Sequence, residues 1–357
     1  MGDERPNLDS AARADARACG RTRRSLVTGG SGFIGSHLVS LLIARGDEVV
    51  VVDNLSTGRR GNLPRSHARL RFVEADLSDA IGGLASERFD EIYHLAAAVG
   101  VKLVTDDPIL AVETNVSRTL DLLRYAFDRA PERGASRHSR VLVVSSSEVY
   151  GKGSKSPFSE DDDVVYGPTT VARWCYGCSK AIDEYLSLAF HRRDGLPVSI
   201  VRLFNTVGPG QVGDYGMVLP RFVRAAIDGV PLEVYGDGTQ TRCFCDVRDV
   251  AGAMPRVLAT SETVGRVFNL GSDQSITILA LAELVIRTLG SASSIKMVPY
   301  ERAYSPGFED LRDRKPDLSR IRGAIGWHPV YGLETTIRDL ARAMTTEPLE
   351  HKAESVT

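Results

Sequence analysis

The stretch RWCYGCSKAIDEY, from Arg173 to Tyr185, holds two pairs of residues that could do chemistry. Tyr176 and Lys180 are four positions apart, which places them on one face of a helix. A lysine ammonium beside a phenol stabilises the phenolate and lowers its pKa, so Tyr176 could act as a base near neutral pH. Cys175 and Cys178 have instead the spacing of a metal or redox site. The rest of the chain has to decide which pair is functional.

A structural zinc site is one alternative, because Cys243 and Cys245 could complete a set of four thiolates. On the predicted helix, however, Cys175 and Cys178 centre roughly 150° away from the face that carries the tyrosine and lysine, by a 100° step per residue. Free cysteine often packs as a small apolar residue. We therefore expect no bound metal and assign the chemistry to the tyrosine and the lysine.

A glycine-rich turn near the N-terminus predicts a dinucleotide site. The run VTGGSGFIGSHL places three glycines between a predicted strand and a predicted helix: Gly29, Gly32 and Gly35. Such glycines let the backbone turn sharply and approach a pyrophosphate, which binds to the free N–H groups of the helix N-terminus. Asp53 ends the next strand, where an acidic residue bonds both ribose hydroxyls and repels a 2′-phosphate. This favours NAD over NADP, although Arg59 and Arg60 follow closely.

Short β-branched runs alternate with amphipathic helical stretches, which predicts a parallel sheet covered by helices on both faces. The fold class is therefore α/β, a Rossmann-type doubly wound sheet with a smaller C-terminal α/β lobe that binds the substrate. Predicted strands after the first are Glu48–Asp53, Arg69–Asp76, Glu91–Ala97, Arg140–Ser147, Pro197–Asn205 and Arg266–Gly271. Predicted helices include Phe33–Arg45, Ile109–Asp128, Cys175–Arg193 and Leu219–Ile227. The expected division is a disordered tail at 1–24, a Rossmann domain at 25–205 with return segments at about 238–271, a substrate lobe at 206–237 and 272–345, and a tail at 346–357.

Composition excludes several other classes of protein. The 357 residues are 43% hydrophobic and 25% charged with a net charge of −2, which indicates neither nucleic acid nor a membrane surface as a partner. No apolar run approaches the roughly 20 residues that span a bilayer. Five cysteines in a chain of this size do not make a disulfide framework. We expect a reduced, cytoplasmic protein.

Six motifs together resemble the extended short-chain dehydrogenase/reductase family, the NAD-dependent nucleotide-sugar epimerases, dehydratases and decarboxylases. They are TGGSGFIGSH, YHLAA, SSSEVYG, YGCSK, RLFNTVGPGQ and YGDGTQTR, and the resemblance runs from about Leu26 to Leu340. It implies a tightly held NAD and a UDP- or dTDP-sugar bound between the lobes. It also implies a homodimer in which the helices near Ile109–Asp128 and Cys175–Arg193 pair into a four-helix bundle.

The same resemblance implies the residues of each site. The NAD site would comprise Gly29, Gly32, Phe33, Ile34, Gly35, Asp53, Asn54, Asp76, Leu77, Leu95, Ala96, Ala97, Asn115, Tyr176 and Lys180. The nucleotide sugar would be held by Asn205, Val218, Leu219, Phe222, Tyr235, Arg242 and Arg314. Arg312 is an alternative to Arg314 as the second diphosphate clamp, and Lys102 could meet a sugar carboxylate, although a surface role suits that lysine better.

The tripeptide Ser146–Ser147–Glu148 points to one reaction of the family. The 4,6-dehydratases carry hydroxyl, aspartate and glutamate here, and the aspartic acid protonates the departing 6-hydroxyl. Ser147 cannot supply that proton, so dehydration is disfavoured. Hydroxyl–serine–glutamate is the pattern of the UDP-glucuronate decarboxylases, whose oxidised C4 lets CO2 leave from a β-keto acid. We therefore predict UDP-glucuronate decarboxylation to UDP-4-keto-pentose or UDP-xylose, with Tyr176, Lys180, Ser146, Ser147, Glu148 and Arg242 as catalytic residues.

Two alternatives stay open. The segment NTVGPGQVGDYGMVLP and the tail GFEDLRDRKPDLSRIRGAIGW also resemble 4-epimerases, which would act on a UDP-hexose or a UDP-uronate. A non-catalytic NAD-sensing regulator could use the same fold, but such proteins usually lose the tyrosine or the lysine, and this chain keeps both.

Overall fold

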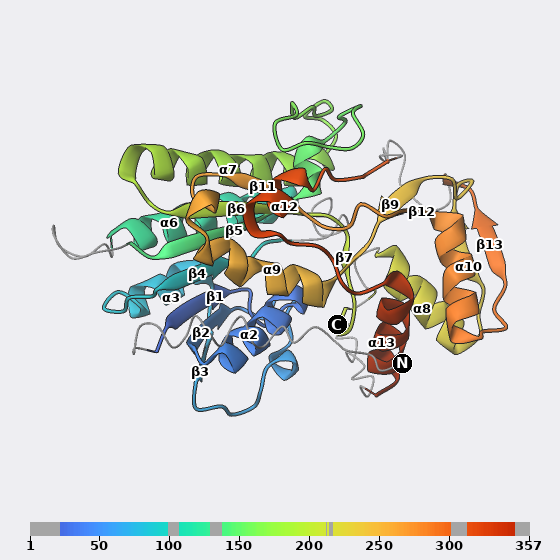
Figure 1. Cartoon of the computed structure of the whole chain (residues 1–357), viewed down its shortest axis with the longest axis horizontal. Coiled ribbons are helices and arrows are strands. Elements are labelled where there is room, and N and C mark those ends of the chain that lie inside the picture. Colours follow the sequence, from blue (N-terminus) through green and yellow to red (C-terminus); the bar gives the residue numbers. More distant parts are fainter. Residues whose placement is uncertain are drawn as a thin grey trace, which may run out of the picture.

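The computed structural model describes residues 22–98, 107–128, 138–211, 213, 217–300 and 313–346. Its centre is a seven-stranded parallel sheet in the order β3-β2-β1-β4-β5-β6-β11 (Figure 1). The strands are β1 (Arg24–Thr28), β2 (Glu48–Asp53), β3 (Leu70–Glu74), β4 (Glu91–His94), β5 (Arg140–Ser146), β6 (Val198–Leu203) and β11 (Val267–Leu270). The predicted parallel α/β sheet is thus confirmed, with several strands a few residues shorter than the β-branched runs suggested.

Helices cover both faces of this sheet, as the near-continuous apolar strands require. Side chains of β2 alternate, so that Val49 and Val51 face α2 (Phe33–Arg45) and α9 (Val247–Ala259) in one core cluster. Val50 and Val52 belong to the second cluster, with α3 (Leu77–Gly83), α6 (Arg118–Asp128) and α7 (Trp174–Asp194). The result is a three-layer α/β/α sandwich of the Rossmann type.

The helix expected at Ile109–Asp128 is interrupted by a single π-helical turn. It consists of α5 (Pro108–Val112), the π-turn η2 (Glu113–Ser117) and α6. This turn carries the fully buried Asn115, whose Oδ1 accepts from the Ala98 N–H at 2.9 Å and whose Nδ2 donates to Ser179 Oγ at 2.9 Å. Turns of this kind concentrate at functional sites. Here the turn ties the chain after β4 to helix α7.

A smaller lobe lies beside the carboxyl edge of the sheet, to the right in Figure 1. It comprises α8 (Val218–Asp228), β8 (Leu232–Tyr235), α10 (Ile278–Leu289), β13 (Ile295–Val298) and α13 (Leu333–Thr346), which share one core. Short elements complete the described chain: β7 (Thr206–Val207), β9 (Thr241–Cys243), β10 (Cys245–Asp246), β12 (Ser275–Thr277), α12 (Ser319–Ile325), and the 3-10 turns η1 (Arg60–Asn62), η3 (Ser147–Tyr150) and η4 (Ser261–Thr263).

The division into two lobes at fixed residue numbers stays a prediction, and one segment departs from it. Helix α12 lies in the range assigned to the substrate lobe, yet Ile321 packs in the core of the sheet with Leu318 and Trp327. The chain therefore returns to the sheet once more before α13. In the described residues no helix is both long and apolar enough to cross a membrane.

Candidate active site

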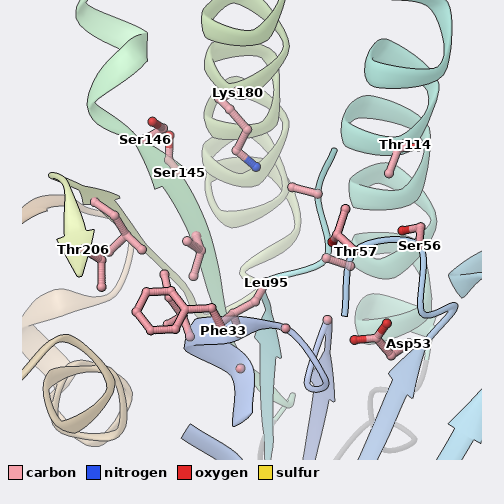
Figure 2. A pocket seen from close by; sticks show the side chains of 18 of the residues that line it. Phe33, Asp53, Ser56, Thr57, Leu95, Thr114, Ser145, Ser146, Lys180 and Thr206 are labelled. Atoms are coloured by element: carbon pink, nitrogen blue, oxygen red, sulfur yellow. The ribbon is translucent and has the colours of Figure 1, made fainter. Parts of the chain in front are cut away.

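A cavity of about 450 Å³ opens at the carboxyl ends of the central strands. Parallel strands present their carboxyl ends at one edge of a sheet, so the loops that follow β1, β2, β4 and β5 converge there. Figure 2 shows Asp53 at one end of this cavity, and Ser146 and Lys180 at the other. One hollow therefore joins the glycine turn to the Tyr176–Lys180 helix.

The turn after β1 can pack this tightly only because Gly29 and Gly35 have no side chains. Gly29 has φ +71°, and a Cβ there would lie 2.7 Å from the Ala96 nitrogen. A Cβ on Gly35 would lie 2.2 Å from the Gly29 carbonyl oxygen, so helix α2 can approach the turn this closely only with glycine. Gly32 immediately precedes α2 and has no side chain to cap the N–H groups of its first turn. The turn fits the pyrophosphate of a dinucleotide.

Asp53 is held rigidly at the end of β2. Its Oδ2 accepts from the Ser31 N–H at 2.8 Å and its Oδ1 from the Leu55 N–H at 2.9 Å. Of the two following arginines, Arg59 lines the cavity, whereas the Arg60 guanidinium lies over the Phe72 ring at 4.7 Å. A carboxylate thus faces the position where the adenosine ribose of a dinucleotide would bind, with one arginine near it.

The second end of the cavity is built by β5 and α7. Strand β5 ends at Ser146, whose Oγ accepts from the Glu148 N–H at 3.2 Å and so starts the turn η3. Tyr176 and Lys180 reach the same cavity from the first turns of α7. All three side chains line one cavity, and their catalytic roles stay predictions.

The expected electrostatic role of Lys180 differs in the structure. Burial raises the pKa of Tyr176, the charges of Glu148 and Asp183 raise it further, and the Ser146 hydroxyl acts in the opposite direction. The Lys180 ammonium is hydrogen-bonded to Asp183 Oδ2 at 2.7 Å. The predicted lowering of this pKa by the lysine is therefore not seen, because burial is the largest cause of the shift and raises the pKa.

Glu148 lies between two guanidinium groups. Arg314 Nη1 donates to Oε1 at 2.5 Å, and Arg173 Nη2 donates to Oε2 at 3.4 Å. Burial raises the pKa of this carboxyl, but Arg314, Arg173 and the more distant Arg242 outweigh it, so that the pKa is lowered. Glu148 is therefore an ionised carboxylate in a cluster of net positive charge.

Arg173 was not identified from the sequence, although it lines the cavity and is buried. It lies three residues before Tyr176, one helical turn away, so the periodicity that paired the tyrosine with the lysine could have found it. Arg118 was missed as well. It lines the cavity and forms an ion pair with Asp76 at 2.6 Å, and no signal in the sequence pairs these two residues.

The structure brings most of the predicted cofactor residues together. Every one of them lines the cavity except Asn115, which lies behind it on the π-turn. Among the predicted substrate residues, Asn205 and Arg314 line it. Asn205 has φ +32°, an unfavourable backbone conformation for a residue with a side chain and one that clusters at functional sites.

The other predicted substrate residues do not line this cavity. Leu219 and Phe222 are buried in the core of the smaller lobe, and Val218 packs against the same core. The Tyr235 hydroxyl accepts from Arg221, and Arg242 donates to the Thr241 carbonyl at 2.8 Å. Their roles toward a substrate stay predictions. Lys102 and Arg312 lie outside the described residues.

The cysteines are free thiols in the described part of the chain. Cys175 packs with Tyr176, Ala98 and Ala111. Cys243 is buried, and Cys245 is buried in the core that α2 and α9 form with the sheet. Burial raises the pKa of both buried thiols. Within the described ranges, no group of three or more histidine, cysteine, aspartate or glutamate side chains could hold a metal ion.

Comparison with known proteins identifies the family. Residues 25–271 match the model of the NAD dependent epimerase/dehydratase family. The chain is 39% identical over 321 residues to UDP-N-acetyl-alpha-D-glucosaminuronate decarboxylase of Bacillus cytotoxicus, covering 89% of this chain and 96% of that protein. It is 38% identical over 315 residues to UDP-glucuronic acid decarboxylase 1 of Arabidopsis thaliana, covering 88% of this chain and 68% of that protein.

Solved structures agree with this assignment. A dTDP-glucose 4,6-dehydratase of Streptomyces venezuelae, with NAD bound, superposes with a TM-score of 0.77 at 32% identity, over 90% of this chain and 97% of that one. The UDP-glucuronic acid 4-epimerase of Bacillus cereus, in complex with UDP-glucuronic acid and NAD, has a TM-score of 0.77 at 26% identity, over 90% and 99%. The chain belongs to the NAD-dependent epimerase/dehydratase family of extended short-chain dehydrogenases/reductases, and it is an enzyme that uses NAD.

Proposed function

We propose that this enzyme decarboxylates a UDP-hexuronate, with UDP-glucuronate as the first candidate. The observation that carries this proposal is the composition of the β5 end: two serines followed by a glutamate that Arg314 and Arg173 hold in its charged form. No acid stands at position 147 to protonate a leaving hydroxyl. The relatives that match over most of this chain are named as decarboxylases of UDP-linked uronates, which supports the same reaction.

The side chains of the cavity account for the first step. NAD, when bound, supplies a hydride acceptor for C4 of the sugar. Tyr176 would take the proton of the 4-hydroxyl, and the buried site would hold the sugar beside it. The product of this oxidation is a β-keto acid, whose C–CO2 bond can break with the electron pair moving into the C4 carbonyl.

The following step needs stabilisation of an enolate at that carbonyl oxygen. Ser146 and the protonated Tyr176 lie in the same cavity and can each donate a hydrogen bond to the developing negative charge. The Glu148 carboxylate would disfavour a second carboxylate nearby, and this repulsion is relieved when CO2 leaves. Protonation of C5 would complete the balance and leave a 4-keto-pentose nucleotide, or UDP-xylose if the C4 ketone is then reduced again.

Within this reaction, the candidate substrates differ mainly in the substituent at C2 of the sugar. The relative from Bacillus cytotoxicus, which the chain matches nearly end to end, is named for a substrate with an N-acetyl group. UDP-N-acetylglucosaminuronate is therefore the second candidate substrate. The 4-epimerisation of a UDP-hexose or a UDP-uronate is the competing reaction, since the solved structures with this fold include a UDP-glucuronic acid 4-epimerase.

The experiment is incubation of the purified enzyme and NAD with UDP-glucuronate or UDP-N-acetylglucosaminuronate, followed by CO2 assay and mass spectrometry of the nucleotide. We expect CO2 and a pentose nucleotide from one of the two, and neither from the Tyr176→Phe variant with NAD still bound. A product with the same mass as the substrate would contradict decarboxylation and indicate epimerisation.

We further propose that the enzyme is a cytoplasmic homodimer. Large apolar side chains are exposed along α5 and α7, led by Ile109 at 75% and Tyr185 at 64%. These helices pack side by side, so a second copy of the pair could cover both in a four-helix bundle. The free cysteines suit a reducing compartment.

A further inference from the structure

Asp183 is a buried carboxylate of helix α7 that faces Lys180 one turn earlier. The Lys180 Nζ donates to Asp183 Oδ2 at 2.7 Å, and the two side chains are 2% and 0% exposed. The hydroxyl of Thr119 on α6 is a further hydrogen-bond partner of this carboxyl. Buried ion pairs contribute little net stability, because the cost of removing both charges from water offsets their attraction. Stability alone is thus a weak reason for this pair.

The Lys180–Asp183 ion pair connects the cavity with the buried interior behind it. Lys180 lines the cavity, whereas Asp183 lies behind it, next to Thr119 on α6. The Thr119 Oγ1 is 3.0 Å from His94 Nε2, and the His94 Nδ1 is 2.7 Å from Thr28 Oγ1. Burial and the charge of Lys180 lower the pKa of His94 to about 3, so this imidazole is neutral. Asp183 is therefore the charged partner of Lys180 on this side.

We propose that Asp183 is a positioning residue, which holds the Lys180 ammonium in one direction and sets the pH range over which Tyr176 works as a base. The proposal rests on the proposed function, in which Tyr176 takes the proton of the sugar hydroxyl. Asp183 has no access to the cavity and acts through its neighbours.

Charge supports this role in two ways. Asp183 offsets the ammonium that would otherwise stabilise a phenolate, and its own negative charge raises the pKa of Tyr176. Glu148 acts in the same direction from η3. The ionisable groups around the phenol, the lysine and Asp183 are Glu148, Arg173, Lys180, Asp183, His94 and Glu184, with Arg242 and Arg314 beyond Glu148 and Arg202 beyond Glu184.

The test compares Asp183→Asn with wild type by the pH profile of CO2 release. Loss of the carboxylate charge should move the acidic limb of kcat/KM about one pH unit lower, because a charge this close shifts a pKa by at least that much. We expect kcat at the optimum to fall about tenfold, as for a misplaced proton-transfer group, with KM for the UDP-uronate changed less than threefold. Asp183→Glu should return the limb toward its wild-type position.

Glu184 offers a matched control. It is the next residue of α7, it is also buried, and it accepts from Arg202 at 2.9 and 2.7 Å rather than from Lys180. Glu184→Gln removes a buried charge from the same helix, and we expect the acidic limb to stay in place. A limb that stays in place in Asp183→Asn as well, or a change confined to KM, would show that the pair is only structural.

The folding of each variant and the proposed decarboxylase activity are checked separately. Thermal unfolding and NADH binding establish that each variant is folded. If Asp183→Asn does not fold, Asp183→Ala and Asp183→Ser carry the same test, and failure of all three to fold would overturn the proposal. Absence of CO2 release in wild type would refute the decarboxylase itself, and activity retained in Tyr176→Phe would refute the tyrosine base.

Discussion

Arg314 and Glu148 are 166 residues apart in the sequence, and the arginine donates a 2.5 Å hydrogen bond to the glutamate in the active-site cavity. The same carboxylate contacts Arg173 at 3.4 Å. One negative charge thus partly neutralises two positive ones, at the end of the cavity where the tyrosine and the serines lie. A substrate that brings a diphosphate and a uronate carboxylate would meet a net positive charge there.

Replacing Glu148 by Gln tests this arrangement. Without the negative charge, we expect UDP-glucuronate to bind about fivefold more tightly, equivalent to about 1 kcal/mol of relieved repulsion, while CO2 release slows at least tenfold. Calorimetric titration and a CO2 assay measure the two effects. UDP-glucose, which has no carboxylate, is the control ligand. Equal tightening for both nucleotides would mean that the carboxylate does not bind near Glu148.

Asp53 should decide between NAD and NADP. Asp53→Asn keeps a side chain that can accept from the Ser31 or Leu55 N–H but removes the charge that repels a 2′-phosphate. We expect the preference for NADH over NADPH, measured by fluorescence titration, to fall at least tenfold. Because Arg59 lines the cavity nearby, adding Arg59→Ala should abolish the gain in NADPH binding. An unchanged preference for NADH would mean that the adenosine ribose does not bind beside Asp53.

Gly35 should tolerate no side chain. The Cβ of alanine would lie 2.2 Å from a backbone oxygen of the turn, so either the turn or α2 must move. We expect Gly35→Ala to weaken NADH binding at least tenfold, equivalent to about 1.4 kcal/mol or more. Gly252→Ala in helix α9 is the matched control, since nothing lies within 4 Å of its added Cβ. That variant should gain roughly 0.5–1 kcal/mol of stability and bind NADH normally.

His94 should make the fold sensitive to acid. Its pKa is about 3 in the folded protein against 6.5 in the unfolded chain, so the unfolded state binds the extra proton first as the pH falls. The His94 contribution to the free energy of unfolding is therefore neutral above pH 6.5, and it lowers that free energy by about 1.4 kcal/mol per pH unit between 6.5 and 3. Urea unfolding of wild type and His94→Asn across this range measures it. Equal slopes for the two proteins would show that other groups dominate.

The exposed apolar face of α5 and α7 should control the oligomeric state. Tyr185→Asp places a charge on this face, and we expect it to convert a dimer to a monomer by analytical ultracentrifugation. Val330→Asp is the control, because Val330 is an exposed apolar residue outside both helices. A monomeric wild-type protein, or a Tyr185→Asp variant that is still a dimer, would contradict the proposed four-helix bundle.

The sequence by itself determined the parts of this protein that depend on local order. Glycines spaced between a strand and a helix, an aspartate at the next strand end, and a tyrosine four residues before a lysine are each local patterns, and the structure places all of them on one cavity. The serine–serine–glutamate run is equally local. Together these patterns were enough to identify the α/β fold, the family and NAD.

Only the tertiary structure decided which distant charges meet. Arg314 reaches Glu148 from the far end of the chain, and Arg118 reaches Asp76. Leu219 and Phe222 lie in a core rather than at the cavity, because the lobe packs their helix face inward. Lys180 turns to Asp183 because both side chains are buried, and a buried ammonium needs a nearby anion. Periodicity encodes helices and strands, whereas these pairings follow from how the elements pack.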